Sequence, residues 1–142
     1  MAMWSMIVMG LSGTGFWTPL NLIAHTFWRS VPLGGAFSWP GLLIGMVMHL
    51  AMSIALGIAL AVLVTAIGGW ATTTAGGVLA GMAFGLIVWL VMQYLVWDAI
   101  DPAAAERFTP WVFVIGHLMY GLVTGLAIAG ARSSVGTVRT AR

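Results

Sequence analysis

The chain consists largely of long apolar stretches, which alternate with short breaks rich in glycine, proline and polar residues. The four apolar stretches cover about residues 4–28, 41–66, 75–97 and 110–131. A helix of about 20 residues, with a rise of about 1.5 Å per residue, is long enough to cross the apolar core of a bilayer. The pattern therefore predicts an all-α membrane protein of one integral domain. It would be an antiparallel bundle of four transmembrane helices, followed by a basic tail at residues 132–142.

The breaks indicate where the helices end. Small and polar residues between Ser12 and Asn21 interrupt the first stretch, and Pro19 is expected to kink a helix there. In the polar loop at residues 98–109, Asp101-Pro102 has the pattern of an N-cap followed by the first residue of a short helix. Arg29 and Asp98 occupy matching places beside two breaks, so we expect them to pair at the membrane rim.

Composition supports a membrane protein and excludes several kinds of site. Apolar residues make up 61% of the chain and charged residues 6%, whereas a soluble domain carries about a quarter charged residues. The absence of cysteine excludes disulfides, thiolate metal sites and thiol nucleophiles. The sequence has no phosphate-binding loop, serine–histidine–acid arrangement or zinc-protease motif, so we expect a non-enzymatic protein.

The distribution of charge predicts the orientation in the membrane. Arg132, Arg139 and Arg142 lie in the C-terminal tail, which carries no acid. The positive-inside rule places this tail in the cytoplasm of a bacterial inner membrane, and four crossings place the N-terminus there too. We interpret the basic balance of the chain as a signal for orientation and expect no nucleic-acid binding.

The second and fourth stretches resemble each other, which indicates an internal repeat. From His49 the chain reads HLAMSIALGIALA, and from His117 it reads HLMYGLVTGLAIA. A duplication would make the bundle two pseudo-symmetric helical hairpins of the same orientation, with the two histidines as symmetry mates.

The same two segments carry a family resemblance. GHLMYGLVTGL at residues 116–126 and HLAMSIALG at residues 49–57 resemble the paired His-containing helices of small YagU-like bacterial inner-membrane proteins. The resemblance implies a helical bundle in the inner membrane and assigns no catalytic residue.

Small or polar residues recur every four positions and predict which helix faces pack. The series are Gly41, Gly45, His49, Ser53 and Gly57, then Gly77, Gly81 and Gly85, then His117, Gly121, Gly125 and Ala129. Helices in lipid associate through such small residues and through interhelical hydrogen bonds. The histidines on these series are therefore expected to face protein rather than lipid.

Polar residues gather in one layer of the predicted bundle. His49 lies nine residues after Pro40 and His117 seven after Pro110, about 13 and 10 Å along their helices, so the imidazoles are nearly level. The layer also contains Asn21, His25, Ser53, Gln93 and Tyr120. Ionisable side chains at such depth are costly, which is why they indicate a functional site.

Two level imidazoles on facing helices predict a candidate haem b site with His49 and His117 as axial ligands. A ligating histidine needs an acceptor for its other ring nitrogen, and the remaining polar residues of the layer are the candidates. Three uses of the pair stay open. They are a haem or metal site, a proton relay or small-ligand site, and a plain hydrogen bond across the bundle.

These observations lead us to expect a protein of the lipid bilayer that either serves as an accessory subunit of a larger membrane complex or homo-oligomer, or binds a cofactor through the paired histidines. Haem-based electron transfer is the alternative function. A small oligomeric channel or transporter, with a wet path past Asn21, His25 and Gln93, is a further alternative.

Overall fold

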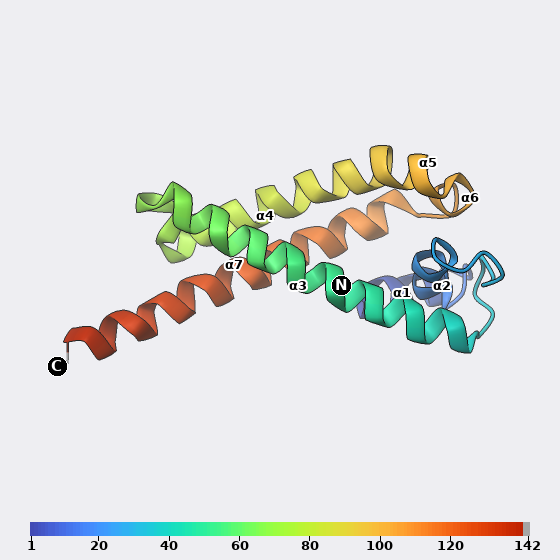
Figure 1. Cartoon of the computed structure of the whole chain (residues 1–142), viewed down its shortest axis with the longest axis horizontal. Coiled ribbons are helices and arrows are strands. Elements are labelled where there is room, and N and C mark those ends of the chain that lie inside the picture. Colours follow the sequence, from blue (N-terminus) through green and yellow to red (C-terminus); the bar gives the residue numbers. More distant parts are fainter. Residues whose placement is uncertain (141–142) are drawn as a thin grey trace.

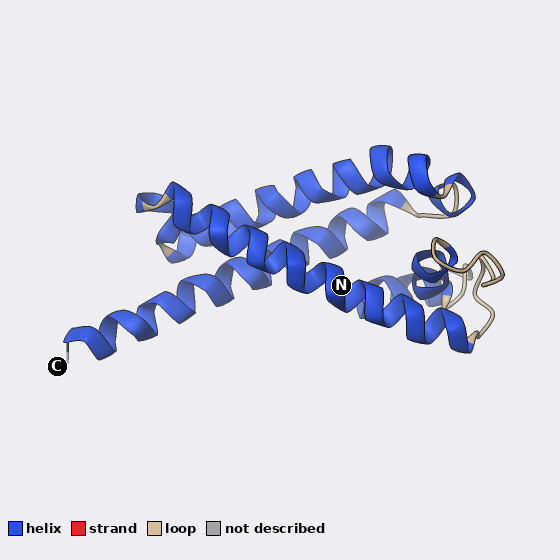
Figure 2. Cartoon of the chain, viewed as in Figure 1, coloured by secondary structure: helices blue, strands red, loops and turns tan. Residues whose placement is uncertain are grey.

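The computed structural model describes residues 1–140, with side chains up to Arg132, and every regular element in this part of the chain is a helix (Figure 2). This confirms the predicted all-α class. In chain order the elements are α1 (Ala2–Leu11), α2 (Thr18–His25), α3 (Trp39–Ile67), η1 (Gly69–Thr72), α4 (Thr74–Val91), the π-helical turn η2 (Met92–Val96), α5 (Trp97–Ile100), α6 (Pro102–Ala105) and α7 (Pro110–Thr140).

Three helices are long and apolar enough to cross a membrane. They are α3, the continuous helix Thr74–Ile100 formed by α4, η2 and α5, and the Pro110–Arg132 part of α7. They match the second, third and fourth predicted spans. Helix α7 continues to Thr140, so most of the predicted tail is helical, while Arg142 lies outside the described residues.

The first predicted span is wrong as a single helix. Residues 12–17 separate α1 from α2, and Gly13 (φ 80°) and Gly15 (φ 111°) adopt backbone conformations there that glycine favours. Pro19 lies in the first turn of α2, where proline starts a helix instead of kinking one. With 10 residues, α1 is about 15 Å long, too short to cross a bilayer.

The two short helices lie at the end of the molecule where α3 begins and α6 is located (Figure 1). The indole nitrogen of Trp4 in α1 donates a hydrogen bond to the carbonyl of Val112, at the start of α7, over 3.0 Å. The N-terminal helices are therefore far from the C-terminal end of α7. This differs from the predicted topology, since a short helix, α2, pairs with α3 in place of a full first span, and α1 lies far from the last described turn of α7.

Helices α4 and α7 form a tight antiparallel pair, which we call the C-terminal hairpin. A Cβ added at Gly81 would overlap the Gly121 carbonyl, and one at Gly85 would overlap the His117 carbonyl. A Cβ added at Gly125 would likewise overlap the Gly77 carbonyl. The predicted glycine series thus packs these two helices backbone to backbone, as expected for helices in lipid.

Helices α2 and α3 form a second close pair, which we call the N-terminal unit. The Leu20 carbonyl of α2 lies against Gly45, and the Asn21 side chain lies against Gly41. The first two glycines of the α3 series therefore bind α2 and not another long helix. In Figure 1, α3 crosses the C-terminal hairpin at an angle and diverges from it toward the α2–α6 end.

Candidate functional site

A partly open cavity of about 420 Å³ lies between the N-terminal unit and the C-terminal hairpin. Its walls come from α2, α3, the α4–α5 helix and α7, and most of the lining side chains are apolar or aromatic. Met48, Met52, Val88, Phe108 and Phe113 are examples. The volume falls within the range of small-molecule sites, about 300–1,000 Å³.

Four of the seven predicted site residues line this cavity. They are His49 and Ser53 from α3, and His117 and Tyr120 from α7. Both histidines therefore line the same cavity, on the sides of α3 and α7 that face it. The two imidazoles come together where α3 crosses α7, since His49 lies on α3 and His117 on α7.

The ring of His117 has a defined orientation. Its Nδ1 lies 2.8 Å from the carbonyl oxygen of Phe113, one turn earlier in α7. A carbonyl oxygen only accepts hydrogen bonds, so in the neutral ring Nδ1 carries the proton and Nε2 keeps a free lone pair. Ligating histidines are commonly oriented by such a bond to a backbone carbonyl.

The hydroxyl groups of Ser53 and Tyr120 do not accept hydrogen bonds from the imidazoles as the sequence had predicted; they bind backbone carbonyls instead. Ser53 Oγ donates to the carbonyl of His49 over 2.8 Å, and the Tyr120 hydroxyl donates to the carbonyl of Ser53. Gly57 leaves room for this contact, since a Cβ there would lie 3.2 Å from the Tyr120 oxygen. These two side chains therefore tie α3 to α7 beside the histidines. The acceptor for His117 is the Phe113 carbonyl, which the sequence did not single out.

Asn21 and Gln93 lie away from the cavity lining. The amide nitrogen of Asn21 donates to the carbonyls of Gly34 and Ala36, each over 2.8 Å, and so holds the loop before α3 against α2. Gln93 is buried within the π-helical turn. Neither residue lines the cavity wall, so their predicted place around the histidines is not what the structure shows.

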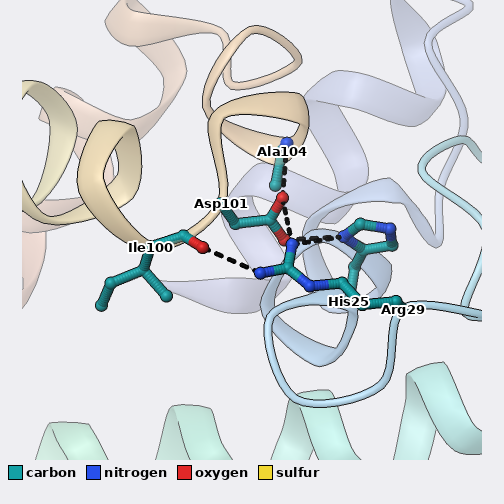
Figure 3. A network of polar contacts seen from close by, with 5 residues as sticks. All are labelled: His25, Arg29, Ile100, Asp101 and Ala104. Carbon is teal, nitrogen blue, oxygen red and sulfur yellow. Dashed lines mark hydrogen bonds and ion pairs between the residues drawn. The ribbon is translucent and has the colours of Figure 1, made fainter.

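His25, the remaining predicted residue, belongs to a polar network at the α2–α6 end (Figure 3). The carboxylate of Asp101 is fully buried and accepts a hydrogen bond from His25 Nδ1 over 2.6 Å. It also forms an ion pair with Arg29 over 2.6 Å. Arg29 donates a further hydrogen bond to the carbonyl of Ile100 over 2.8 Å. The network joins α2 and the residues after it to the α5–α6 turn.

Asp101 has two roles in this network. Its Oδ1 accepts a hydrogen bond from the backbone N–H of Ala104, which confirms the predicted N-cap of the short helix α6. Burial raises the pKa of Asp101, but the hydrogen bonds from His25 and Ala104 and the charges of His25 and Arg29 outweigh it and hold that pKa below its ordinary value. The carboxylate is therefore ionised at neutral pH.

The sequence missed the long-range part of this network. The expected partner of Arg29 was Asp98, but Arg29 pairs with Asp101 and Asp98 is exposed. The Asp101-Pro102 pattern was a signal for the cap. It gave no information about pairing with α2, because that pairing depends on how α2 folds back after the break at residues 12–17.

Nothing matches this chain among protein-family models, curated proteins or solved structures.

Proposed function

We propose that this chain is a non-enzymatic membrane protein that binds an apolar cofactor in the cavity, with His49 and His117 as the polar groups that hold it. The observation that carries the proposal is that both imidazoles line one cavity of ligand size whose other walls are largely apolar. An apolar ligand gains free energy on burial against such walls, while a few polar groups fix its orientation.

Haem b is the first cofactor to test. Bis-imidazole ligation of haem iron uses one lone pair from each ring, and the Phe113 carbonyl leaves the Nε2 lone pair of His117 available for it. The apolar and aromatic lining suits a porphyrin face, and the bound group would supply one-electron transfer. The protein's own part is to orient His117, to hold α3 beside α7 through Tyr120 and Ser53, and to limit water in the cavity.

We further propose a place in the bacterial inner membrane, as an accessory subunit of a larger complex or as a homo-oligomer. The three apolar helices, the arginines beyond the third of them and the resemblance to YagU-like proteins support this location. With three crossings, the tail would be cytoplasmic and the α2–α6 end would lie at the opposite face. A channel is less favoured, because Asn21, His25 and Gln93 do not line the cavity.

The test is a haem titration of the purified protein in mild detergent, followed by a reduced-minus-oxidised visible spectrum. We expect one haem per cavity with the split α and β bands of a low-spin, six-coordinate iron. His117→Ala and His49→Ala should each abolish this spectrum. His25→Gln is the matched control, since it removes an imidazole outside the cavity lining and leaves a donor for Asp101. A folded protein that shows no spectral change with added haem would overturn the haem proposal.

A further inference from the structure

The cavity lies between two bodies that are each internally tight. Within the C-terminal hairpin, Gly81 and Gly121 pack backbone to backbone, and within the N-terminal unit Gly45 packs on the Leu20 carbonyl. At the end opposite α6, a buried cluster of Leu60, Val64 and Ala71 joins α3 to η1 and packs against α4 and α7. The two bodies are thus held together at that end by apolar packing.

At the other end the bodies meet through the Asp101 network and through a second buried apolar cluster, in which Leu22 of α2 packs with Ala104 and Phe108. Ile23, Thr26 and Phe27 of the α2 segment line the cavity on one side, and Ile100 and Phe108 line it on the other. His25 and Arg29 belong to the same α2 segment, and Asp101 directly follows Ile100 on the other side. The ion pair and the hydrogen bond to Asp101, drawn in Figure 3, therefore connect the two segments that carry these lining residues.

Both bonds across the walls converge on one buried carboxylate, and the Arg29 bond to the Ile100 carbonyl spans the same gap. A buried charge that loses one partner is left uncompensated, so a partly broken network is unfavourable. A network that is unfavourable when half formed favours a joined and a separated arrangement over intermediate ones, as in the switching elements of proteins.

We propose that Asp101 is a latch of the cavity: while it binds His25 and Arg29 the α2 wall is held against the α6 wall, and when these bonds break the walls separate and a ligand passes. The inference rests on the proposed binding role of the cavity, because it names the device that controls access to that site.

The latch can be tested without any ligand, by thiol labelling of the full chain. The natural chain has no cysteine, so Ser53→Cys places a single small thiol in the cavity wall. We expect a water-soluble maleimide to label this thiol slowly, and the added change Asp101→Asn to raise the rate by about tenfold, equivalent to about 1.4 kcal/mol. Asp98→Asn, an exposed acid three residues away, is the matched control and should leave the rate unchanged.

A second probe separates opening from general loosening. Ala80→Cys lies beside the buried cluster at the opposite end of the molecule, and its labelling should stay slow in the Asp101→Asn background. Equal acceleration at both probes, or no acceleration at Ser53→Cys in a folded Asp101→Asn protein, would overturn the latch. Should Asp101→Asn fail to fold, Arg29→Gln removes the half-exposed partner instead and is expected to accelerate labelling in the same direction. The labelling rates do not depend on haem, so the experiment tests the latch even if the protein binds no haem.

Discussion

The Nδ1 of His117 lies 2.8 Å from the carbonyl oxygen of Phe113, one turn earlier in the same helix. This bond fixes which ring nitrogen holds the proton, and so it decides that His117 offers a lone pair, not a donor, through Nε2. The cavity therefore suits a ligand that brings a metal centre or a hydrogen-bond donor to this ring.

The tautomer of His117 is directly measurable. We expect the Nδ1–H form at neutral pH, because only that form satisfies the Phe113 carbonyl. Long-range nitrogen–proton correlation spectra of imidazole-labelled protein distinguish the two forms. Spectra of His117→Gln identify the His117 signals by their loss. An Nε2–H ring in the folded protein would contradict the orientation described above and remove the support for ligation through Nε2.

Loss of the Asp101 carboxylate should strongly destabilise the fold. Asp101→Ala leaves His25 and Arg29 without their partner and removes the N-cap of α6. Breaking a buried pair by removing one partner costs about 3–5 kcal/mol, and we expect the low end because Arg29 is half exposed. Asp98→Ala should change the free energy of unfolding by less than about 0.5 kcal/mol. Denaturant unfolding in detergent, followed by circular dichroism, gives both values, and equal effects of the two substitutions would contradict the prediction.

The Asp101 network should also make stability fall in acid. The folded-state pKa of Asp101 lies below its ordinary value, so the folded state holds the ionised form more strongly than the unfolded chain does. The resulting stability is fully present above the ordinary aspartate pKa of about 3.9 and is lost as pH falls through the lower folded-state pKa. Melting temperatures measured from neutral to strongly acidic pH should show this decrease. The decrease in melting temperature should be smaller in Asp101→Asn. Identical pH profiles of the two proteins would contradict this role of Asp101.

The glycine contacts of the C-terminal hairpin should tolerate no added methyl group. Gly81→Ala would push a Cβ into the Gly121 carbonyl, and backbone atoms cannot move aside as a flexible side chain can. We expect a loss of about 1–3 kcal/mol, typical of overpacking. Gly34→Ala, where nothing lies within 4 Å of the added atom, is the control and should be nearly neutral. Thermal unfolding in one detergent compares the two variants, and an equally stable Gly81→Ala protein would show that α4 and α7 are less closely packed than described.

Much of the architecture followed from the sequence. Hydropathy alone located the three helices that are long and apolar enough to span a membrane, to within a few residues, because an apolar segment in lipid must satisfy its backbone hydrogen bonds internally and so becomes a helix. The four-residue glycine spacing identified the faces that pack α4 on α7. Helical rise alone placed His49 and His117 at one depth, and both line the cavity. The repeat and the haem site stay predictions.

The first apolar stretch shows where local pattern stopped being sufficient. Its mean hydropathy is compatible with a span, but positive-φ glycines at 13 and 15 and Pro19 divide it into two short helices. The second of these then lies in the α3 groove at Gly41 and Gly45, which the sequence had assigned to packing between long helices. Whether such a stretch spans or folds back depends on partners far along the chain.

The sequence by itself determined the properties that arise within one helix: the length of the apolar helices, their small-residue faces, the position of each histidine along its helix and the Asp101 cap. Only the tertiary structure decided which side chains meet across helices. Asp101 pairs with Arg29 and His25, and Tyr120 with the Ser53 carbonyl, because the crossing of α3 and the fold-back of α2 bring them within reach. The properties within one helix follow from backbone hydrogen bonds between residues a few positions apart. The contacts between helices depend on helix tilt and rotation, which the packing of the whole chain determines.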